Sequence, residues 1–353
     1  MSLRVKLALW AIGIGLVCGF YVVGTGSLRL RLQNVLSDAF QQRVTVQSLA
    51  LRFPLGVRMS GIAMPNAAGQ ETPPISIREA VAQLDLGTLL KGRPRFALEL
   101  KAPRLRIERN PQGSIQFSLL RKTTPEGRLQ VLGIPVSRLR VRDGELILLD
   151  QAVAPQVSGV LRDLSVSLVS GSQRGQYTVN VRGLLEGGSR EPLGILEANG
   201  EMILPTTAEF KISVTHKEVA RLEPYLRQIL GAAPSQGAIH LVSTVTLFNG
   251  GLVADSRLTA TGLAFLTDDP TVLGPSGNHL VQILQDSKGV VNLSFIVKGR
   301  LGEPLDWSNL VESTLREAMR QALAQNIRRA LTDAEQGGSL EEAIRRGMDS
   351  IGR

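Results

Sequence analysis

Apolar and polar residues alternate along most of this chain, in short segments separated by glycine, proline and asparagine. An alternation with a period of two is typical of β-strands that have one buried face and one solvated face. The pattern starts near Val44 and is clearest in Leu105–Glu108, Leu139–Arg142, Val166–Leu168, Tyr177–Val181 and Val291–Phe295. We therefore predict that the body of the protein is mainly β.

Residues that tolerate a positive φ angle lie between these segments, at Asn110–Gly113, Asp143–Gly144, Asn199–Gly200 and Asn249–Gly250. Because such residues favour hairpin turns, we predict four turns and antiparallel pairing of neighbouring strands. The apolar faces of the strands need a cover. Two sheets could close on each other as a sandwich, or one elongated, curled sheet could form a gutter whose apolar interior holds another molecule. The sequence leaves both open.

Helical spacing replaces the alternation in two places before the C-terminal region. Leu30–Phe40 has apolar residues on one side of a helix. Thr215–Gly231 begins with a Thr-x-x-Glu capping box formed by Thr215 and Glu218, and we expect Pro224 to kink or break that helix.

The C-terminal region is also predicted to be helical. A helix from about Trp307 to Leu331, with Asp306 as its cap, carries an apolar stripe and a basic face, and Ser339 and Glu342 form a capping box for another. Such helices usually pack on their own sheet. They also bind membranes or partner proteins, so both uses stay open.

The N-terminal segment Leu7–Leu28 contains no charged residue. As a helix it would be about 33 Å long, enough to cross a hydrocarbon core of about 30 Å. The alternative is a cleaved secretory signal, with Val22 and Gly24 as the small residues before the cut, but the apolar run is longer than a usual signal core. We expect an uncleaved transmembrane anchor. Cationic residues flank both ends, so charge indicates the orientation only weakly.

Composition narrows the partners and the chemistry. The 353 residues carry 40 Lys and Arg against 31 Asp and Glu, a net charge of +9, which favours anionic partners. Aromatic residues are only 4% and do not interleave with a basic run, so we expect no nucleic-acid binding. The single cysteine, Cys18, and three dispersed histidines, His216, His240 and His279, predict no metal site, and we expect no cofactor.

No catalytic motif is present, whether a phosphate-binding loop, a dinucleotide-binding glycine pattern or a nucleophile elbow. The densest polar cluster, Gly274–His279, contains Ser276 and His279, but the sequence supplies no third orienting group. We interpret it as a surface loop, predict no catalytic residue, and expect the protein not to be an enzyme.

Several short motifs follow one another along the chain: Gly61–Asn66, Val81–Leu86, Leu89–Gly92, Leu98–Pro103, Leu105–Arg109, Val141–Leu146, Leu222–Leu226 and the region from Leu284 through Val290–Phe295 to Pro304. In this order they resemble the motifs of AsmA-like proteins, in the domain-of-unknown-function branch of the AsmA/TamB-type envelope proteins. The similarity extends from about Gly61 to Ala330. The chain departs from it at Thr267–Asn278 and in the basic tail Gly338–Arg353.

The resemblance implies an inner-membrane protein with one membrane span and its body in the periplasm. It also implies a curled β-sheet with a hydrophobic interior that contacts membrane phospholipids, in lipid transport, outer-membrane biogenesis or envelope homeostasis. The alternative is a scaffold or assembly factor that binds another envelope protein through its C-terminal helices. We expect an anchor at 1–29, a first β-rich region at 30–214, a helix with a second β-rich region at 215–306, and amphipathic helices at 307–353.

Individual lipid-contacting residues, the lipid cargo and the oligomeric state are not indicated by the sequence. A group of arginines on predicted strands could meet lipid headgroups or could form the solvated face of ordinary strands; these are Arg104, Arg106, Arg138, Arg140 and Arg142.

Overall fold

The computed structural model of the chain describes residues 26–34, 36–38, 43–52, 55–64, 73–90, 95–111, 115–116, 130–131, 134–173, 175–186, 192–204, 207–230, 232–265, 271, 276–286, 288–300, 313–314, 316–326 and 328. Within them no helix is both long and apolar enough to cross a membrane. The predicted anchor falls outside the described residues except at 26–29. The predicted helix that begins at Ser339 also falls outside them.

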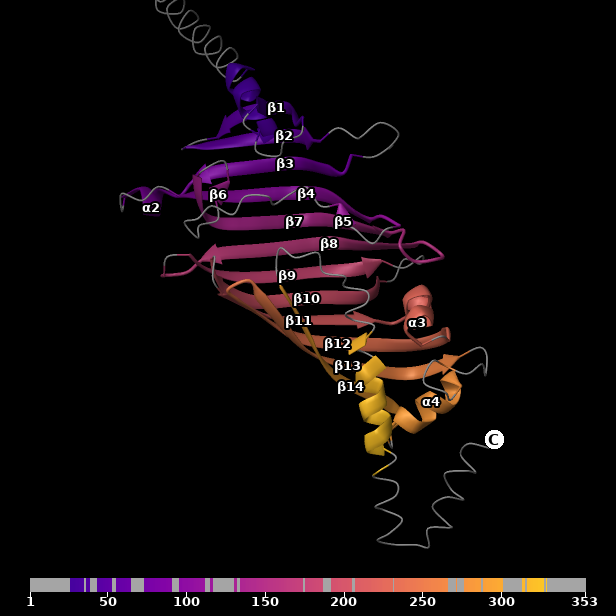
Figure 1. Cartoon of the computed structure of the whole chain (residues 1–353). Helices are drawn as coiled ribbons and strands as arrows, with labels where there is room; N and C mark the ends of the chain where they lie inside the picture. The colour runs from indigo at the N-terminus through magenta and orange to yellow at the C-terminus, as the bar shows by residue number, and fades with distance from the viewer. Residues whose placement is uncertain are drawn as a thin grey trace, which may run out of the picture.

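The body is mainly β, as predicted, and its strands form one sheet that does not close into a barrel. Twelve strands follow one another across this sheet in chain order, with β5 and β6 attached at the side (Figure 1). The strands are β1 (Thr45–Arg52), β2 (Gly56–Ala63), β3 (Ile75–Leu84), β4 (Phe96–Arg109), β5 (Ile115–Gln116), β6 (Gln130–Val131), β7 (Ile134–Asp150), β8 (Val157–Ser170), β9 (Gln176–Glu186), β10 (Pro192–Ile203), β11 (Thr207–His216), β12 (Pro234–Phe248), β13 (Gly251–Phe265) and β14 (Val290–Arg300).

Neighbouring strands are antiparallel with one exception, so the sheet is mixed. β4 and β7 are parallel, and the chain between them includes the short strands β5 and β6. The prediction of antiparallel neighbours is wrong at this pair, because a parallel pair needs a long connection that local alternation does not reveal. The described strands do not divide into two opposed sheets, so the sandwich alternative is not the architecture found.

Two of the four predicted turns are correct. Asn249 and Gly250 connect β12 to β13 with φ angles of 48° and 82°, and β5 pairs back onto the end of β4 after Asn110. The other two predictions are wrong: Asp143–Gly144 lies inside β7 and Asn199–Gly200 inside β10. Residues that tolerate unusual backbone angles also occur within strands, at bulges and close approaches.

A transverse row of such residues crosses the N-terminal half of the sheet. Gly61 in β2, Ala102 in β4, Asp143 in β7 and Asp163 in β8 have φ angles of 60°, 46°, 52° and 50°. The strand registers place the four at about the same level, and the register shifts at this level between β7 and β8. We call this row the crease. At a bulge the strand bends and its side-chain alternation changes phase.

The helix at 26–34 and 36–38 agrees with the prediction for Leu30–Phe40 and packs on the first strands. Its Leu36 joins Val46, Met59 and Ala80 in a buried cluster. The Arg29 guanidinium donates to the Gln47 carbonyl (3.0 Å), on the outermost strand β1. The helix thus covers one end of the sheet and occupies a carbonyl of its edge strand, which would otherwise be open to pairing with another chain.

Helices also cover the other end. α4 (Gly277–Leu284) and the helix at 316–326 pack against β13 and β14, and Leu280, Leu284, Val291, Leu293 and Met319 form the buried centre (Figure 1). The prediction of a helix within Trp307–Leu331 is confirmed for the described residues. Its ends and Asp306 lie outside them.

The prediction of a helix that begins with a capping box at Thr215 and Glu218 is wrong. Thr215 remains in β11, which ends at His216, and Glu218 makes no side-chain cap. A 3₁₀ helix, Val219–Leu222, leads into α3 (Glu223–Leu230). Pro224 lies in the first turn of α3, where a missing N–H costs nothing, so it marks the start of that helix.

Candidate functional site: the apolar face of the sheet

One face of the sheet is apolar across its middle strands. The registers of β7 to β11 bring their inward apolar residues into rows that run from strand to strand. These residues are Leu139, Val141, Leu146 and Leu148 in β7; Leu161, Leu164, Val166 and Leu168 in β8; Tyr177, Val179, Val181 and Leu185 in β9; Leu196, Ala198 and Met202 in β10; and Ala208, Phe210, Ile212 and Val214 in β11. We call this surface the apolar face.

The crease keeps these residues on one side. In β4 the apolar face receives Leu98 and Leu100 before Ala102, and Leu105 and Ile107 after it, so the alternation changes from even to odd numbers. Without the change in phase, half of each creased strand would direct its apolar residues to the opposite side.

The middle of the apolar face has no core of its own. The two buried clusters draw on β1 to β4 and on β12 to β14, and the described residues of β7 to β11 contribute to neither. On this part of the face Val141, Leu161, Leu168, Tyr177 and Ala208 are buried, whereas Val179, Val181, Phe210 and Ile212 are half-buried. Within the described residues, the end helices therefore cover the two ends of the apolar face but not its middle.

A polar cluster interrupts the apolar face at one border. The Asp150 carboxylate, 4% exposed, accepts hydrogen bonds from Arg109 Nη1 (3.2 Å) and from the Tyr225 hydroxyl (2.7 Å) at the same oxygen, Oδ2. Its other oxygen accepts the N–H of Ala152 (2.9 Å). Because α3 follows β11 and Asp150 ends β7, this cluster ties together elements that lie several strands apart in the sheet.

The electrostatics of this cluster keep the Tyr225 phenol neutral. Burial raises the pKa of Tyr225 well above its ordinary value, and the hydrogen bond to Asp150 raises that pKa further because the phenol is the donor. Sequence analysis missed the cluster, although a signal exists. Arg109 follows Leu105 and Ile107, and Asp150 follows Leu146 and Leu148, so a charged residue ends the apolar series on two paired strands.

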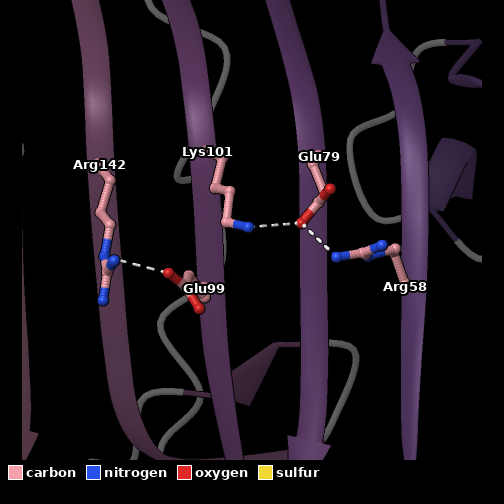
Figure 2. A network of polar contacts seen from close by, with 5 residues as sticks. All are labelled: Arg58, Glu79, Glu99, Lys101 and Arg142. Atoms are coloured by element: carbon pink, nitrogen blue, oxygen red, sulfur yellow. Dashed lines mark hydrogen bonds and ion pairs between the residues drawn. The ribbon is translucent and has the colours of Figure 1, made fainter. Parts of the chain in front are cut away.

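The opposite face is polar and carries ion pairs between strands. Glu79 in β3 accepts from Lys101 in β4 (2.9 Å) and contacts Arg58 in β2 (3.4 Å), while Arg142 in β7 contacts Glu99 in β4 (3.1 Å) (Figure 2). The hydrogen bond from Lys101 lowers the pKa of the Glu79 carboxyl, with Arg58 as a further cause. We call this surface the polar face.

The five predicted headgroup arginines all lie on the polar face. Arg104 pairs with Glu145 (3.1 Å) and Arg106 with Glu108 (2.6 Å), while Arg142 pairs with Glu99. Arg138 and Arg140 alternate with the inward Leu139 and Val141. Their placement matches the solvated-face alternative, so a headgroup bound beside the apolar face would not meet them directly.

Ser276 and His279 are brought together, but as part of a helix start. Ser276 is the N-cap of α4, its hydroxyl accepts the N–H of His279 (3.5 Å), and it lies 2.9 Å from His279 Nδ1. The interpretation of these two residues as a surface loop is wrong because they belong to the helix and Ser276 is buried. A hollow of about 570 Å³ lies beside β14, and Ser276 is not among the residues that line it.

The other two histidines do not converge on a common site. His216 faces the apolar side at the end of β11, and burial lowers its pKa, as does the nearby Arg221. His240 lies on the polar side of β12, 3.1 Å from the Thr215 hydroxyl. Among the residues the structure describes, no three potential ligands of the His, Cys, Asp or Glu type gather as a metal site would require.

No known protein family matches the chain, and no curated protein is similar enough to it to count as a relative. The resemblance to AsmA-like proteins thus stays a prediction, and the apolar face is the feature on which a function can be argued.

Proposed function

We propose that this protein is a membrane-anchored, non-enzymatic envelope protein of the AsmA-like type that binds phospholipid acyl chains on its apolar face, in lipid transport or envelope homeostasis. The observation that carries the proposal is the middle of that face, five strands wide, which the end helices leave uncovered within the described residues. Its half-buried side chains keep part of their apolar surface in water, which is unfavourable by about 25 cal/mol per Å². An acyl chain laid across them would remove that area from water.

The chemistry of the face suits acyl chains better than a polar substrate. From β7 to β11 its inward residues are almost all aliphatic, with few groups that could orient a polar ligand by hydrogen bonds. A surface of this kind selects for apolar character and tolerates different chain lengths. The proposed placement, with one span in the inner membrane and the body in the periplasm, rests on the predicted anchor and on the family resemblance.

The direct test is native mass spectrometry, with lipid extraction, of the purified full chain. We expect co-purified phospholipid on the wild type and loss of most of it in Val181→Asp, because that substitution places a charge in the middle of the apolar face. The matched control is Asn180→Asp, the next residue of β9, which is exposed on the polar face and should keep its lipid.

A second pair makes the test independent of one strand. Ile212→Asp in β11 should lose lipid, and Lys211→Asp on the other side of the same strand should not. Circular dichroism and thermal unfolding identify variants that have lost the fold. A correctly folded wild type that never carries phospholipid would exclude acyl-chain binding.

The alternative, a scaffold that binds another envelope protein through its C-terminal helices, receives less support from the described residues. Ala318 and Met319 are buried, and Met319, Ala322 and Leu323 pack against the protein's own β13–β14 core. The apolar stripe is thus used internally along 316–326. A partner that co-purifies with the wild type and is lost on deletion of Trp307–Arg353, without any bound lipid, would favour the scaffold.

A further inference from the structure

Exposed apolar side chains gather at one place on the polar face, near the hairpin that joins β12 to β13. Phe248 is 64% exposed, Val253 42% and Ile296 52%. They lie on three adjacent strands, and the register places Val253 beside Lys298 and Phe248 beside Gly251, which in turn pairs with Arg300. We call Phe248, Val253, Ile296, Lys298 and Arg300 the rim patch.

The hairpin holds Phe248 at the border of the sheet. Asn249 and Gly250 both have positive φ, as a two-residue hairpin turn requires. Because the cross-strand neighbour of Phe248 is a glycine, no side chain covers the ring from that strand. The phenyl group therefore points out at the tip of a short, tightly connected turn, where it can meet another surface.

The rim patch itself contains two cations and no carboxylate. Carboxylates border it on one side, where Asp255 pairs with Ile296 and lines a hollow together with Ile296 and Glu317 of the neighbouring helix. Glu209 on β11 lies two strands from Val253. The two cations within the rim patch, together with the net charge of +9 for the whole chain, predict an anionic partner.

Size indicates which anionic partner fits. A stable protein interface needs about 800 Å² from each partner, far more than three side chains offer. A bilayer surface needs less, because one aromatic ring at the headgroup level and a few nearby cations suffice for reversible attachment. We propose that the rim patch docks on the surface of an anionic phospholipid bilayer, with Phe248 inserted between headgroups and Lys298 facing lipid phosphates.

The test uses the full chain, kept in solution by a non-ionic amphipol, and flotation with vesicles of phosphatidylcholine with or without phosphatidylglycerol. We expect flotation with the anionic vesicles only, weakened by added salt. Lys298→Glu should lower the partition coefficient by about tenfold or more, because each charge at such a surface changes it by about fivefold. Phe248→Ser should lower it as well.

Two matched controls are available on the same sheet. Lys288→Glu makes the same charge change just before the opposite end of β14, and Ile195→Ser removes an exposed apolar side chain from the polar side of β10. Both should bind like the wild type. Equal flotation with neutral and anionic vesicles, no flotation at all, or an equal loss in Lys288→Glu would overturn the proposal.

The outcome is separable from acyl-chain binding. The rim patch lies on the polar face, so Phe248→Ser and Lys298→Glu should retain the co-purified phospholipid. Loss of vesicle binding with bound lipid retained supports the docking surface. Loss of both from the patch variants would mean that they act through the fold, and the proposal would fail.

Discussion

The covered ends and the open middle of the apolar face contain the same kinds of side chain in different surroundings. Leu293, in the C-terminal cluster, is 3% exposed beneath α4 and the helix at 316–326. Val181 and Phe210 in the middle occupy equivalent inward positions and are half-buried. The difference arises from what lies over the strand. The strand itself is alike in both regions, with the same alternation of apolar and polar residues.

This contrast separates stability from binding. Buried clusters at the two ends account for the tertiary packing of the helices on the sheet, and the middle strands are held mainly by their ladders of backbone hydrogen bonds and by cross-strand neighbours. Substitutions at the ends should therefore change the free energy of unfolding most, and substitutions in the middle should change ligand binding most.

The largest effect is expected from truncation in the end cluster. Leu293→Ala should lower the free energy of unfolding by about 2–5 kcal/mol, because it leaves a cavity under two helices. Val181→Ala should cost less than about 1.5 kcal/mol, since part of that side chain is already in water. Urea unfolding monitored by circular dichroism measures both. Equal losses at the two positions would show that the middle is as tightly packed as the end.

The next largest loss of stability is expected from breaking the hydrogen bond between Tyr225 of α3 and Asp150 of β7. Tyr225→Phe removes the donor to the buried Asp150 carboxylate and should cost about 1–3 kcal/mol. If α3 restricts access to the apolar face, the variant should also exchange a fluorescent phospholipid faster than the wild type. Unchanged stability would place Tyr225 outside the tertiary packing.

The raised pKa of Tyr225 has a consequence at high pH. A phenol that ionises less readily in the folded state contributes stability that is present below the ordinary tyrosine pKa of about 10 and is lost as the pH rises above it. The wild type should therefore lose stability between about pH 9 and 11, and Tyr225→Phe should lose less over that interval. Urea midpoints at the two pH values test this.

His216 should make a smaller contribution to the pH dependence of stability, and here stability is lost as the pH falls. Burial lowers its pKa, so the folded state prefers the neutral ring, and the stability present above the ordinary histidine pKa of about 6.5 is lost as the pH falls below it. His216→Gln should reduce this loss on going from pH 7.5 to pH 5. His240→Gln, on the polar face, should leave the loss as it is in the wild type.

The smallest effect should come from the ion pairs in Figure 2. Glu79→Gln removes two contacts with cations on neighbouring strands, but such pairs are screened by salt and exposed pairs contribute little. We expect a change in unfolding midpoint that is smaller than for any substitution above and that vanishes at high salt. A large, salt-independent loss would mean that the polar face contributes as much as the end clusters.

Local pattern predicted the strands well. The segments Leu105–Glu108, Val166–Leu168, Tyr177–Val181 and Val291–Phe295 all lie in strands, because period-two alternation reports directly on a half-buried sheet. The helical spacing within Trp307–Leu331 was also informative, since its apolar stripe packs on the sheet where it is described.

Features that depend on distant partners were not predictable. A gutter and a sandwich impose the same alternation, so the open face could not be inferred from it. The parallel β4–β7 pair depends on a long connection, which local alternation does not reveal. Thr215 is part of strand β11, although its spacing to Glu218 fits a capping box. Asp150 and Tyr225 are 75 residues apart, and only the fold brings them within 2.7 Å.

The crease makes chain length within a strand as important as side-chain chemistry. Ala102 and Asp143 each shift the phase of their strand by one residue, so deletion of either would turn Leu105 and Ile107, or Leu146 and Leu148, toward water and bring arginines and glutamates onto the apolar face. Added or lost residues at the β12–β13 hairpin would change no face. Insertions and deletions should therefore be tolerated at hairpin tips and selected against along one line across the sheet, even where every substitution on that line is mild.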